Sequence, residues 1–260
     1  MANGGRLGAR NVPGVDGYSG VWSLREIADA VRKGIWKPYL DLVLEDNPLV
    51  YYRLDETSGT AAADSSGNGN NGTYIGGPTL NQGPLILDGR AVSFDGSNDQ
   101  IDGPALNLLG NVTVEAWYMP AALPSNAYVL SHGGAAVSEA EEDNASYSIY
   151  VSGSSLSMLW EYGGGSNVIV PSGTTLVVGT PYHIIMERDA TEKTVTFTVN
   201  GVTNVVSYST NPTGGGNGIL RVGFFANAAR ANGVIDEVAV YDHLLGATRV
   251  AAHYNAGIAQ

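Results

Sequence analysis

Acidic side chains are the most numerous ionisable groups in this sequence, with 25 Asp and Glu residues against 13 Lys and Arg and no cysteine. Glycoside hydrolysis needs two carboxylates that face each other across a cleft. Asp236 and Glu237 are adjacent in a predicted strand, where successive side chains point to opposite faces, so we do not expect them to form such a pair. We recognise no facing pair elsewhere and no Glu-x-Asp-x-x-Glu pattern, by which sandwich glucanases place carboxylates on one strand. We therefore expect the protein not to be an enzyme.

Histidine and cysteine patterns exclude several other kinds of site. The four histidines show no His-x-x-x-His spacing, and the absence of cysteine excludes thiolate zinc sites, cysteine nucleophiles and disulfides. His183 lies in an alternating segment and is expected to be a half-buried packing residue. The sequence contains no Gly-x-Ser-x-Gly elbow, phosphate-binding loop or dinucleotide-binding fingerprint.

The segment DSSGNGNNG, residues 64–72, concentrates many side-chain oxygens in a short loop. Calcium prefers several oxygen ligands from carboxylates, amides and carbonyls, so this loop is a candidate calcium site. Asp64, Asn68 and Asn70 can equally accept hydrogen bonds from their own backbone as Asx turns. The residue types alone leave both interpretations open.

The overall charge limits the choice of partners. A formal net charge of −12 disfavours binding to nucleic acids and to anionic membranes. No apolar run approaches the roughly 20 residues that a membrane-spanning helix needs, and residues 1–10 do not resemble a signal peptide. We therefore expect a protein that carries no secretion signal and binds neither nucleic acid nor membrane.

From Pro48 onward, short segments alternate apolar and polar residues and are separated by Gly, Pro, Asn and Asp. This pattern predicts strands, and Asn200-Gly201 between two alternating runs predicts a tight hairpin. Many short strands at this spacing indicate an all-β antiparallel sandwich of the jelly-roll type over residues 48–260. The predicted strands are 49–54, 91–94, 112–118, 127–131, 147–151, 156–161, 168–170, 182–188, 194–199, 202–208, 220–225 and 234–241.

Two short helices are expected outside the strands. Ser23 and Glu26 have the spacing of a capping box, which predicts a helix over Leu24–Lys33 within an N-terminal segment, residues 1–47. A second short helix is predicted near the C-terminus, ending at Gly257. The first helix is too short to be stable alone, so its apolar face must pack either on the sandwich or on a partner. The candidate partner-binding residues on it and beside it are Trp22, Leu24, Ile27, Val31 and Trp36.

Several fragments, in order along the chain, resemble the laminin-G-like jelly-roll family, which is related to concanavalin A-like lectins and glucanases. They are VYYRLDETSGTAAADSSGNGNNGTY, AVSFDGSNDQID, VTVEAWYMP, YHIIMERDATEKTVTFTVNGV and GVIDEVAVYDHLLGATRVAAHYNAG. The resemblance implies a sandwich with Phe94, Trp117 and Ile235 between its sheets. It also implies a structural calcium ion, for which the matching ligands are Asp64, Asn68, Asn71 and Asp236.

Aromatic side chains offer a further candidate site, because the C–H faces of sugars stack on aromatic rings. The alternative is that these aromatic residues form the core of the sandwich. The candidates for a glycan platform are Tyr118, Tyr128, Trp160, Tyr162 and Tyr208.

The segment SGVWSLREIADAVRKGIWKP, residues 19–38, resembles a segment of tailed-bacteriophage structural proteins. This resemblance implies a non-enzymatic virion surface component, such as a capsid decoration or tail fibre protein. It would attach to other virion proteins through residues 1–47, form a homo-oligomer such as a trimer, and contact host-surface glycans. The alternative is a carbohydrate-binding module of a secreted protein or a bacterial surface protein, and a glycosidase with unrecognised carboxylates is a third class.

Overall fold

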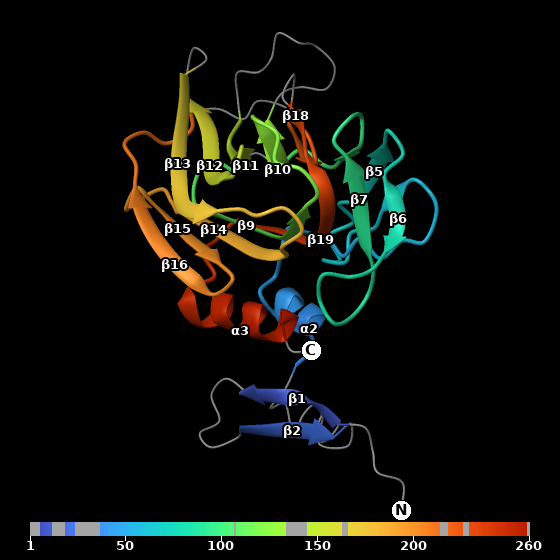
Figure 1. The fold of residues 1–260 in the computed structure, drawn as a ribbon. Coiled ribbons are helices and arrows are strands. Elements are labelled where there is room, and N and C mark those ends of the chain that lie inside the picture. The colour runs from blue at the N-terminus through green and yellow to red at the C-terminus, as the bar shows by residue number, and fades with distance from the viewer. Residues whose placement is uncertain are drawn as a thin grey trace, which may run out of the picture.

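The structure is a computed structural model, and it describes residues 6–11, 19–23, 37–106, 108–133, 145–162, 166–213, 218–225 and 229–258. It confirms the expected antiparallel β-sandwich of the jelly-roll type, with short helices beside it (Figure 1). None of the helices in these ranges is long and apolar enough to cross a membrane.

Two sheets form the sandwich. The helix-covered sheet has the order β16-β15-β14-β9-β19-β7-β6, with β3 paired to β19. Its strands are β3 (Val50–Tyr52), β6 (Thr79–Gln82), β7 (Ala91–Asp95), β9 (Val112–Pro120), β14 (Tyr182–Asp189), β15 (Thr194–Val199), β16 (Val202–Ser207) and β19 (Asn232–Tyr241).

The opposite sheet has the order β13-β12-β11-β10-β17-β8-β5-β4, with β18 paired to β10. Its strands are β4 (Ala61–Ala62), β5 (Gly72–Ile75), β8 (Gln100–Asp102), β10 (Ala127–Gly133), β11 (Tyr147–Ser152), β12 (Ser155–Tyr162), β13 (Ser166–Thr175), β17 (Ile219–Val222) and β18 (Ala229–Arg230).

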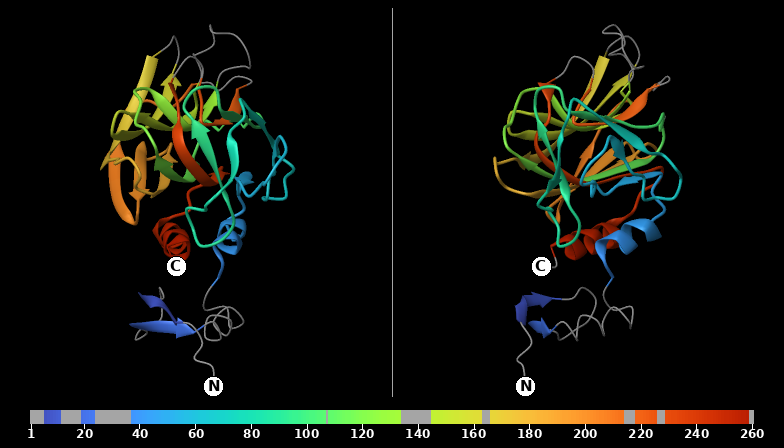
Figure 2. Two further views of the ribbon diagram at one scale, coloured as in Figure 1. Left: turned by 45° about the vertical axis from the view of Figure 1, so that its right-hand side comes forward. Right: turned by 90° about the vertical axis from the view of Figure 1, so that its right-hand side faces the viewer.

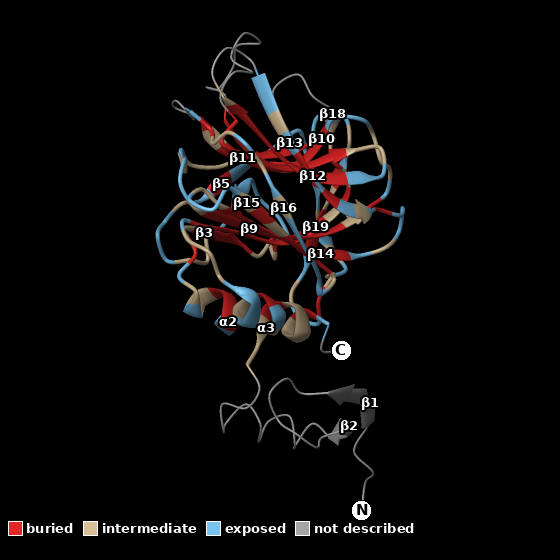
Figure 3. Ribbon diagram, turned by 90° about the vertical axis from the view of Figure 1, so that its left-hand side faces the viewer, coloured by how far each residue is buried: buried red, intermediate tan, exposed pale blue. Residues whose placement is uncertain are grey.

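Alternation along β9 shows how the sequence divides its side chains between two environments. Val114, Ala116 and Tyr118 point inward and join the main core between the sheets, together with Phe94 and Ile235. The intervening residues point outward, where a surface helix covers them. Both faces of β9 are therefore buried, which Figure 3 shows as red on this strand and on the strands beside it.

Two helices lie side by side against the outer face of the helix-covered sheet (Figure 2). Helix α2 spans Tyr39–Glu45 and helix α3 spans Ala247–Gly257. A second apolar cluster lies between the helices and the sheet. It includes Tyr39 and Val43 from α2 and Trp117 and Tyr241 from the sheet. The prediction that Trp117 lies between the sheets was wrong, because its strand position faces outward and the helices bury it there.

The predicted secondary structure is confirmed for the twelve alternating segments and for the C-terminal helix. Asn200 and Gly201 form the predicted hairpin turn between β15 and β16, with φ values of 48° and 76°. The sequence did not predict α2, nor the pairing of β1 (Arg6–Asn11) with β2 (Ser19–Ser23). The predicted helix over Leu24–Lys33 lies outside the described residues.

Candidate functional site

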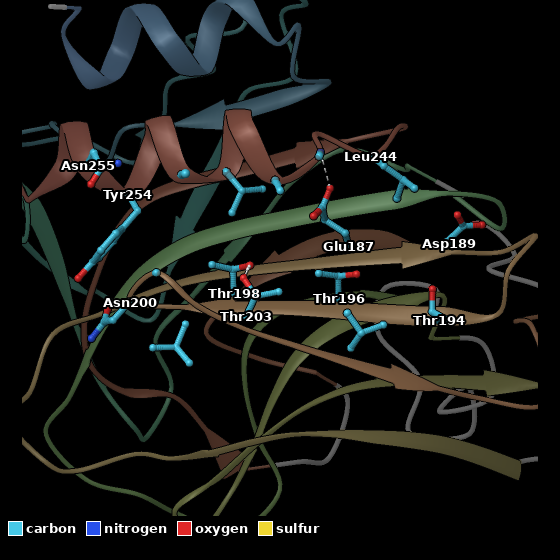
Figure 4. A pocket seen from close by; sticks show the side chains of 17 residues that line it. Glu187, Asp189, Thr194, Thr196, Thr198, Asn200, Thr203, Leu244, Tyr254 and Asn255 are labelled. Atoms are coloured by element: carbon cyan, nitrogen blue, oxygen red, sulfur yellow. Dashed lines mark hydrogen bonds between the residues drawn. The ribbon is translucent and has the colours of Figure 1, made fainter. Parts of the chain in front are cut away.

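A groove of about 640 Å³ lies between helix α3 and the outer face of strands β14, β15 and β16 (Figure 4). Leu244, Gly246 and one side of α3 form one wall, and the strands form the floor. The groove exists because α3 lies over β9 and part of β14, while β16 at the edge of the sheet stays mostly exposed. The lining combines hydroxyl, amide and carboxylate groups with aliphatic side chains.

The floor carries a row of threonines. Thr194, Thr196 and Thr198 alternate along β15, so their side chains share the outer face while the residues between them enter the core. The Thr198 Oγ1 atom lies 3.1 Å from Oγ1 of Thr203 on the neighbouring strand. Val205 lies beside this row and is 58% exposed, so the floor offers methyl groups as well as hydroxyls.

Two carboxylates also line the groove, and both already accept backbone hydrogen bonds. An oxygen of Glu187 accepts the Gly246 N–H at 2.9 Å, at the N-terminus of α3. Burial raises the pKa of Glu187 above its ordinary value, and its backbone hydrogen bonds oppose the shift. Asp189 Oδ1 accepts the N–H groups of Thr191 at 2.9 Å and Glu192 at 3.0 Å, which closes the turn after β14.

The expectation that the sequence lacks a Glu-x-Asp-x-x-Glu pattern was wrong, because this end of β14 carries one. Glu187, Asp189 and Glu192 form a Glu-x-Asp-x-x-Glu pattern, which sandwich glucanases use to place carboxylates on one strand. In this structure β14 ends at Asp189, and Glu192 lies exposed in the following turn. The strand therefore presents two of the three carboxylates to the groove.

One end of the groove is closed by the ring of Tyr254 from α3. The ring stacks on His183 with centroids 5.9 Å apart and on Trp117 with centroids 6.5 Å apart. On the other side, a Cβ atom at Gly201 would lie 2.8 Å from Cε1 of Tyr254. The hairpin glycine and the two stacked rings thus fix the position of this aromatic wall.

Beneath the helices, the carboxylate of Glu115 is fully buried and is the centre of a polar network. It contacts His183 Nε2 at 2.8 Å and His253 Nδ1 at 3.0 Å. The hydroxyls of Tyr39 and Tyr241 donate to it at 2.6 Å and 3.0 Å. His183 was expected to be half-buried, but this pairing allows it to be completely buried.

The charges in this network are set by mutual pairing. Burial would raise the pKa of Glu115, but pairing with His253 and the hydrogen bond from His183 hold that pKa well below its ordinary value. Burial would lower the pKa of His253, but Glu115 and Asp46 raise it to about 10. Burial lowers the pKa of His183, which indicates a neutral ring that donates to Glu115. His253 is thus a buried cation between two carboxylates.

Asp64, the first of the predicted calcium ligands, has both carboxylate oxygens occupied. Oδ1 accepts the N–H groups of Tyr51 and Ser66, each at 3.0 Å. Oδ2 accepts the Asn70 N–H and the Ser66 hydroxyl, each at 2.8 Å. This is the Asx-turn arrangement that the sequence left open.

Asn68 and Asn71 make comparable structural contacts. Nδ2 of Asn68 donates to the Pro48 carbonyl at 3.0 Å, and Oδ1 of Asn71 accepts the Asp64 N–H at 2.8 Å. The Asn68 bond ties the loop to the segment just before β3, and the Asn71 bond closes the loop on itself. Asp236 lies on a different strand, β19.

The expectation that Asp236 and Glu237 point to opposite faces was wrong. The pairing of β19 with β9 shifts register between Asp236 and Ala239, and Glu237 has φ of 50°. Ile235 and Val238 on either side both enter the core, so the bulge places both carboxylates on the outer face.

This carboxylate pair is buried and incompletely satisfied. Asp236 Oδ2 accepts the Leu85 N–H at 2.8 Å, and Tyr51 donates its hydroxyl to Glu237. Asp236 Oδ1 and Glu237 Oε1 have no hydrogen-bond partner among the described residues, although Arg53 Nε lies 3.6 Å from the latter. Burial raises the pKa of Asp236 to about 8, and burial together with Asp236 raises that of Glu237.

The two unpaired oxygens fit a divalent cation better than the saturated carboxylate of Asp64 does. Within the described ranges, no three His, Cys, Asp or Glu side chains converge as a metal site. A calcium ion at Asp236 and Glu237 would therefore also need backbone carbonyl or water ligands.

The aromatic candidates divide between core and surface. Tyr118 and Trp160 belong to the main core and cannot form a platform. Tyr208 packs against Trp160, and Tyr162 is partly exposed at the end of β12. Tyr128 is buried in a small outer cluster on the opposite sheet. None of these five rings lines the groove, whose aromatic wall, Tyr254, was not predicted.

Most of the predicted partner-binding residues lie outside the part of the chain that the structure describes. Trp22 lies in β2, and Leu24, Ile27, Val31 and Trp36 lie outside the described residues.

Comparison with known proteins identifies the class of this fold. Residues 95–251 match the family described as the concanavalin A-like lectin/glucanases superfamily, and the chain belongs to it. A search of curated proteins found no match.

Solved structures share the fold at low sequence identity. Domain 4 of AbnA, an extracellular arabinanase from Geobacillus stearothermophilus solved with arabinotriose, is 18% identical, with a TM-score of 0.59 over 80% of this chain and 98% of that chain. The botulinum neurotoxin serotype G binding domain is 11% identical, with a TM-score of 0.61 over 80% of this chain and 50% of that one. A Trypanosoma rangeli sialidase complex is 11% identical, with a TM-score of 0.59 over 89% and 38% of the two chains.

The shares of the matched chains differ. The chain covers nearly all of the arabinanase domain but only about half of the neurotoxin binding domain. At these identities the similarity establishes the fold alone.

Proposed function

We propose that this protein is a non-catalytic glycan-binding module and that the groove beside α3 holds the glycan. The observation that carries the proposal is the lining of the groove. Hydroxyls, amides and carboxylates can bind sugar hydroxyls, while the exposed valines Val202 and Val205 can contact sugar C–H groups. The membership of the chain in a lectin and glucanase superfamily supports this proposal, as does the arabinotriose bound to a domain of the same fold.

The use of the groove carboxylates favours binding over hydrolysis. Glu187 and Asp189 each accept backbone N–H groups, which commits them to holding α3 and the turn after β14. The third carboxylate of the pattern, Glu192, lies off the strand. Hydrolysis remains the second candidate, because Glu187 has a raised pKa and lines the groove, as a general acid would.

Isothermal titration with an array of oligosaccharides, arabinotriose among them, tests the proposal. Thr196→Val keeps the shape of the floor but removes a hydroxyl, and should weaken binding about tenfold, the effect of about 1.4 kcal/mol. The matched control is Thr73→Val, an exposed threonine on β5 in the opposite sheet. Equal loss of affinity in Thr196→Val and Thr73→Val would contradict binding in the groove. Turnover of an oligosaccharide that Glu187→Gln abolishes would contradict a non-catalytic role.

We also propose, from the resemblance of residues 19–38 alone, that the module is displayed on a virion and attached through residues 1–47. Incorporation of the full chain into particles, with loss of incorporation for the double variant Trp22→Ala and Trp36→Ala, would support this role. A secreted or surface-attached module is the alternative, and it predicts no affinity for particles.

A further inference from the structure

We infer that the groove selects an extended, neutral oligosaccharide and rejects anionic sugars. This inference rests on the proposed function and names the ligand class. Its first ground is the charge of the lining. Glu187 and Asp189 are the only carboxylates among the described residues that line the groove, and no Lys, Arg or His is among them.

The three basic residues that adjoin lining residues in the sequence are held elsewhere. One of them, Arg249 on α3, donates from Nε to Oδ1 of Asp46 at 2.8 Å. Arg188 points to the opposite side of β14, where its guanidinium donates to the carbonyls of Leu108 and Gly110 at 2.9 and 2.8 Å. Lys193 donates from Nζ to the Ser209 carbonyl at 3.0 Å. A sialate, uronate or sulfate in the groove would therefore meet two carboxylates without a counterion, which disfavours the anionic ligand.

The second ground is the shape and repetition of the floor. The distance along β15 from Thr194 to Thr198 is four residue-to-residue steps, about 14 Å at the usual rise of an antiparallel strand. The hydroxyls of Thr194 and Thr196 are partly exposed along this length, whereas Thr198 is nearly buried and shares its hydroxyl with Thr203. At the hairpin end, the Asn200 amide is partly exposed and keeps bonding capacity beyond the His183 N–H that it accepts and the Pro181 carbonyl to which it donates. A row of repeated polar groups suits a chain of sugar rings better than a single terminal sugar.

The third ground is the chemistry of the groups themselves. Threonine hydroxyls and asparagine amides both donate and accept hydrogen bonds, as the hydroxyls of neutral sugars do. The remaining acceptor capacity of Glu187 and Asp189 can take sugar O–H groups. Between these groups, Val202 and Val205 expose 74% and 58% of their surfaces and can pack against sugar C–H groups.

Titration of the full chain with matched ligands tests this inference. The probes are neutral linear oligosaccharides of increasing length, the same oligosaccharides with one hydroxymethyl group oxidised to a carboxylate, and a sialylated oligosaccharide. We expect the affinity to rise at least tenfold from the neutral monosaccharide to the neutral trisaccharide. The acidic counterparts should bind at least tenfold more weakly than the neutral oligosaccharides. Salt should have little effect on the affinity for the neutral ligands. Asp189→Asn, which can retain the turn, should narrow the difference between neutral and acidic ligands.

The outcomes separate the two claims. Equal or tighter binding of the acidic ligands, with loss in Thr196→Val, would overturn the inferred selectivity and leave glycan binding intact. A monosaccharide that binds as tightly as the trisaccharide would overturn the inferred length. Absence of binding for every probe would overturn the proposed function and this inference with it.

Discussion

Buried charge is the feature that most distinguishes this molecule at the level of single residues. Glu115, His253 and Asp46 form a line of alternating charges beneath α2 and α3, and no part of Glu115 or His253 reaches solvent. An unpaired charge there would be costly, so each member holds the others in place. The network thereby fixes α3, which forms the wall of the groove.

The raised pKa of His253 predicts how stability changes with pH. A histidine whose folded pKa is about 10 contributes stability that is fully present below its unfolded pKa of about 6.5 and is lost as pH rises through about 10. The free energy of unfolding should therefore decline between these values. His253→Asn should flatten the decline, and Glu115→Gln should lower the pKa of His253 in an NMR titration.

The exposed His243 serves as the control for this prediction. It pairs with Asp242 at the surface, and His243→Asn should leave the decline unchanged. If the unfolding free energy of the original protein is flat over this range, His253 is not a buried cation.

The unpaired carboxylate oxygens make a separate prediction about calcium. If Asp236 and Glu237 bind the ion, calcium in hundredfold excess over its Kd stabilises the native state by about 2.7 kcal/mol, and a chelator lowers the melting temperature. Asp236→Asn should remove this dependence. Asp64→Asn should retain it, because the Asp64 carboxylate is occupied by backbone and Ser66 donors. A melting temperature that changes neither with calcium nor with chelator would contradict a structural calcium ion.

These residue roles were only partly readable from the sequence. The Asx interactions of Asp64 follow from local spacing, and they were anticipated as one of two options. The joint burial of Asp236 and Glu237 depends on a bulge, which shifts one residue without changing the hydrophobic pattern around it. The roles of His183 and Glu115 depend on α2 and α3 covering an outer face, which alternation along β9 cannot show.

At the level of elements, a glycine allows the end of α3 to lie close against the sheet. A Cβ atom at Gly257 would lie 2.2 Å from Cζ2 of Trp117. Gly257→Ala should therefore push α3 from the sheet and destabilise the fold by about 1–3 kcal/mol, as overpacking usually does. Urea unfolding measures the change.

Gly83→Ala is the matched control, since a Cβ there would meet no atom within 4 Å and no positive φ is involved. It should change stability by less than about 0.5 kcal/mol. If Gly257→Ala leaves the free energy of unfolding unchanged, the packing of α3 on Trp117 is looser than described.

Strong alternation made the long strands predictable, and the Asn-Gly turn made their hairpin predictable. Short strands such as β4 and β8 have two and three residues, too few for a periodic signal. They form because β5 pairs with both of them and β17 pairs with β8. Helix α2 has seven residues and no side-chain cap, so its stability comes from packing that only the folded sheet provides.

For the whole molecule, the boundary of the sandwich can be tested by two truncations. Residues 1–47 were expected to form a separate attachment segment. Within them, Tyr39 donates to Glu115 and Asp46 pairs with Arg249 at 2.8 Å. A chain that starts at Lys37 should melt like the full protein. In a chain that starts at Pro48, the free energy of unfolding should fall by about 1–3 kcal/mol or more. Equal melting of the two shorter chains would assign α2 to the attachment segment.

The central claim is that the groove beside α3 binds a glycan, and NMR chemical-shift mapping tests it most directly. Titration of the isotope-labelled full chain with a neutral linear trisaccharide should shift the amides of Thr196, Asn200 and Tyr254 in a saturable way. Amides of the opposite sheet, such as Thr73, should stay in place. Shifts confined to the opposite sheet, or no saturable shift with any oligosaccharide, would contradict the account.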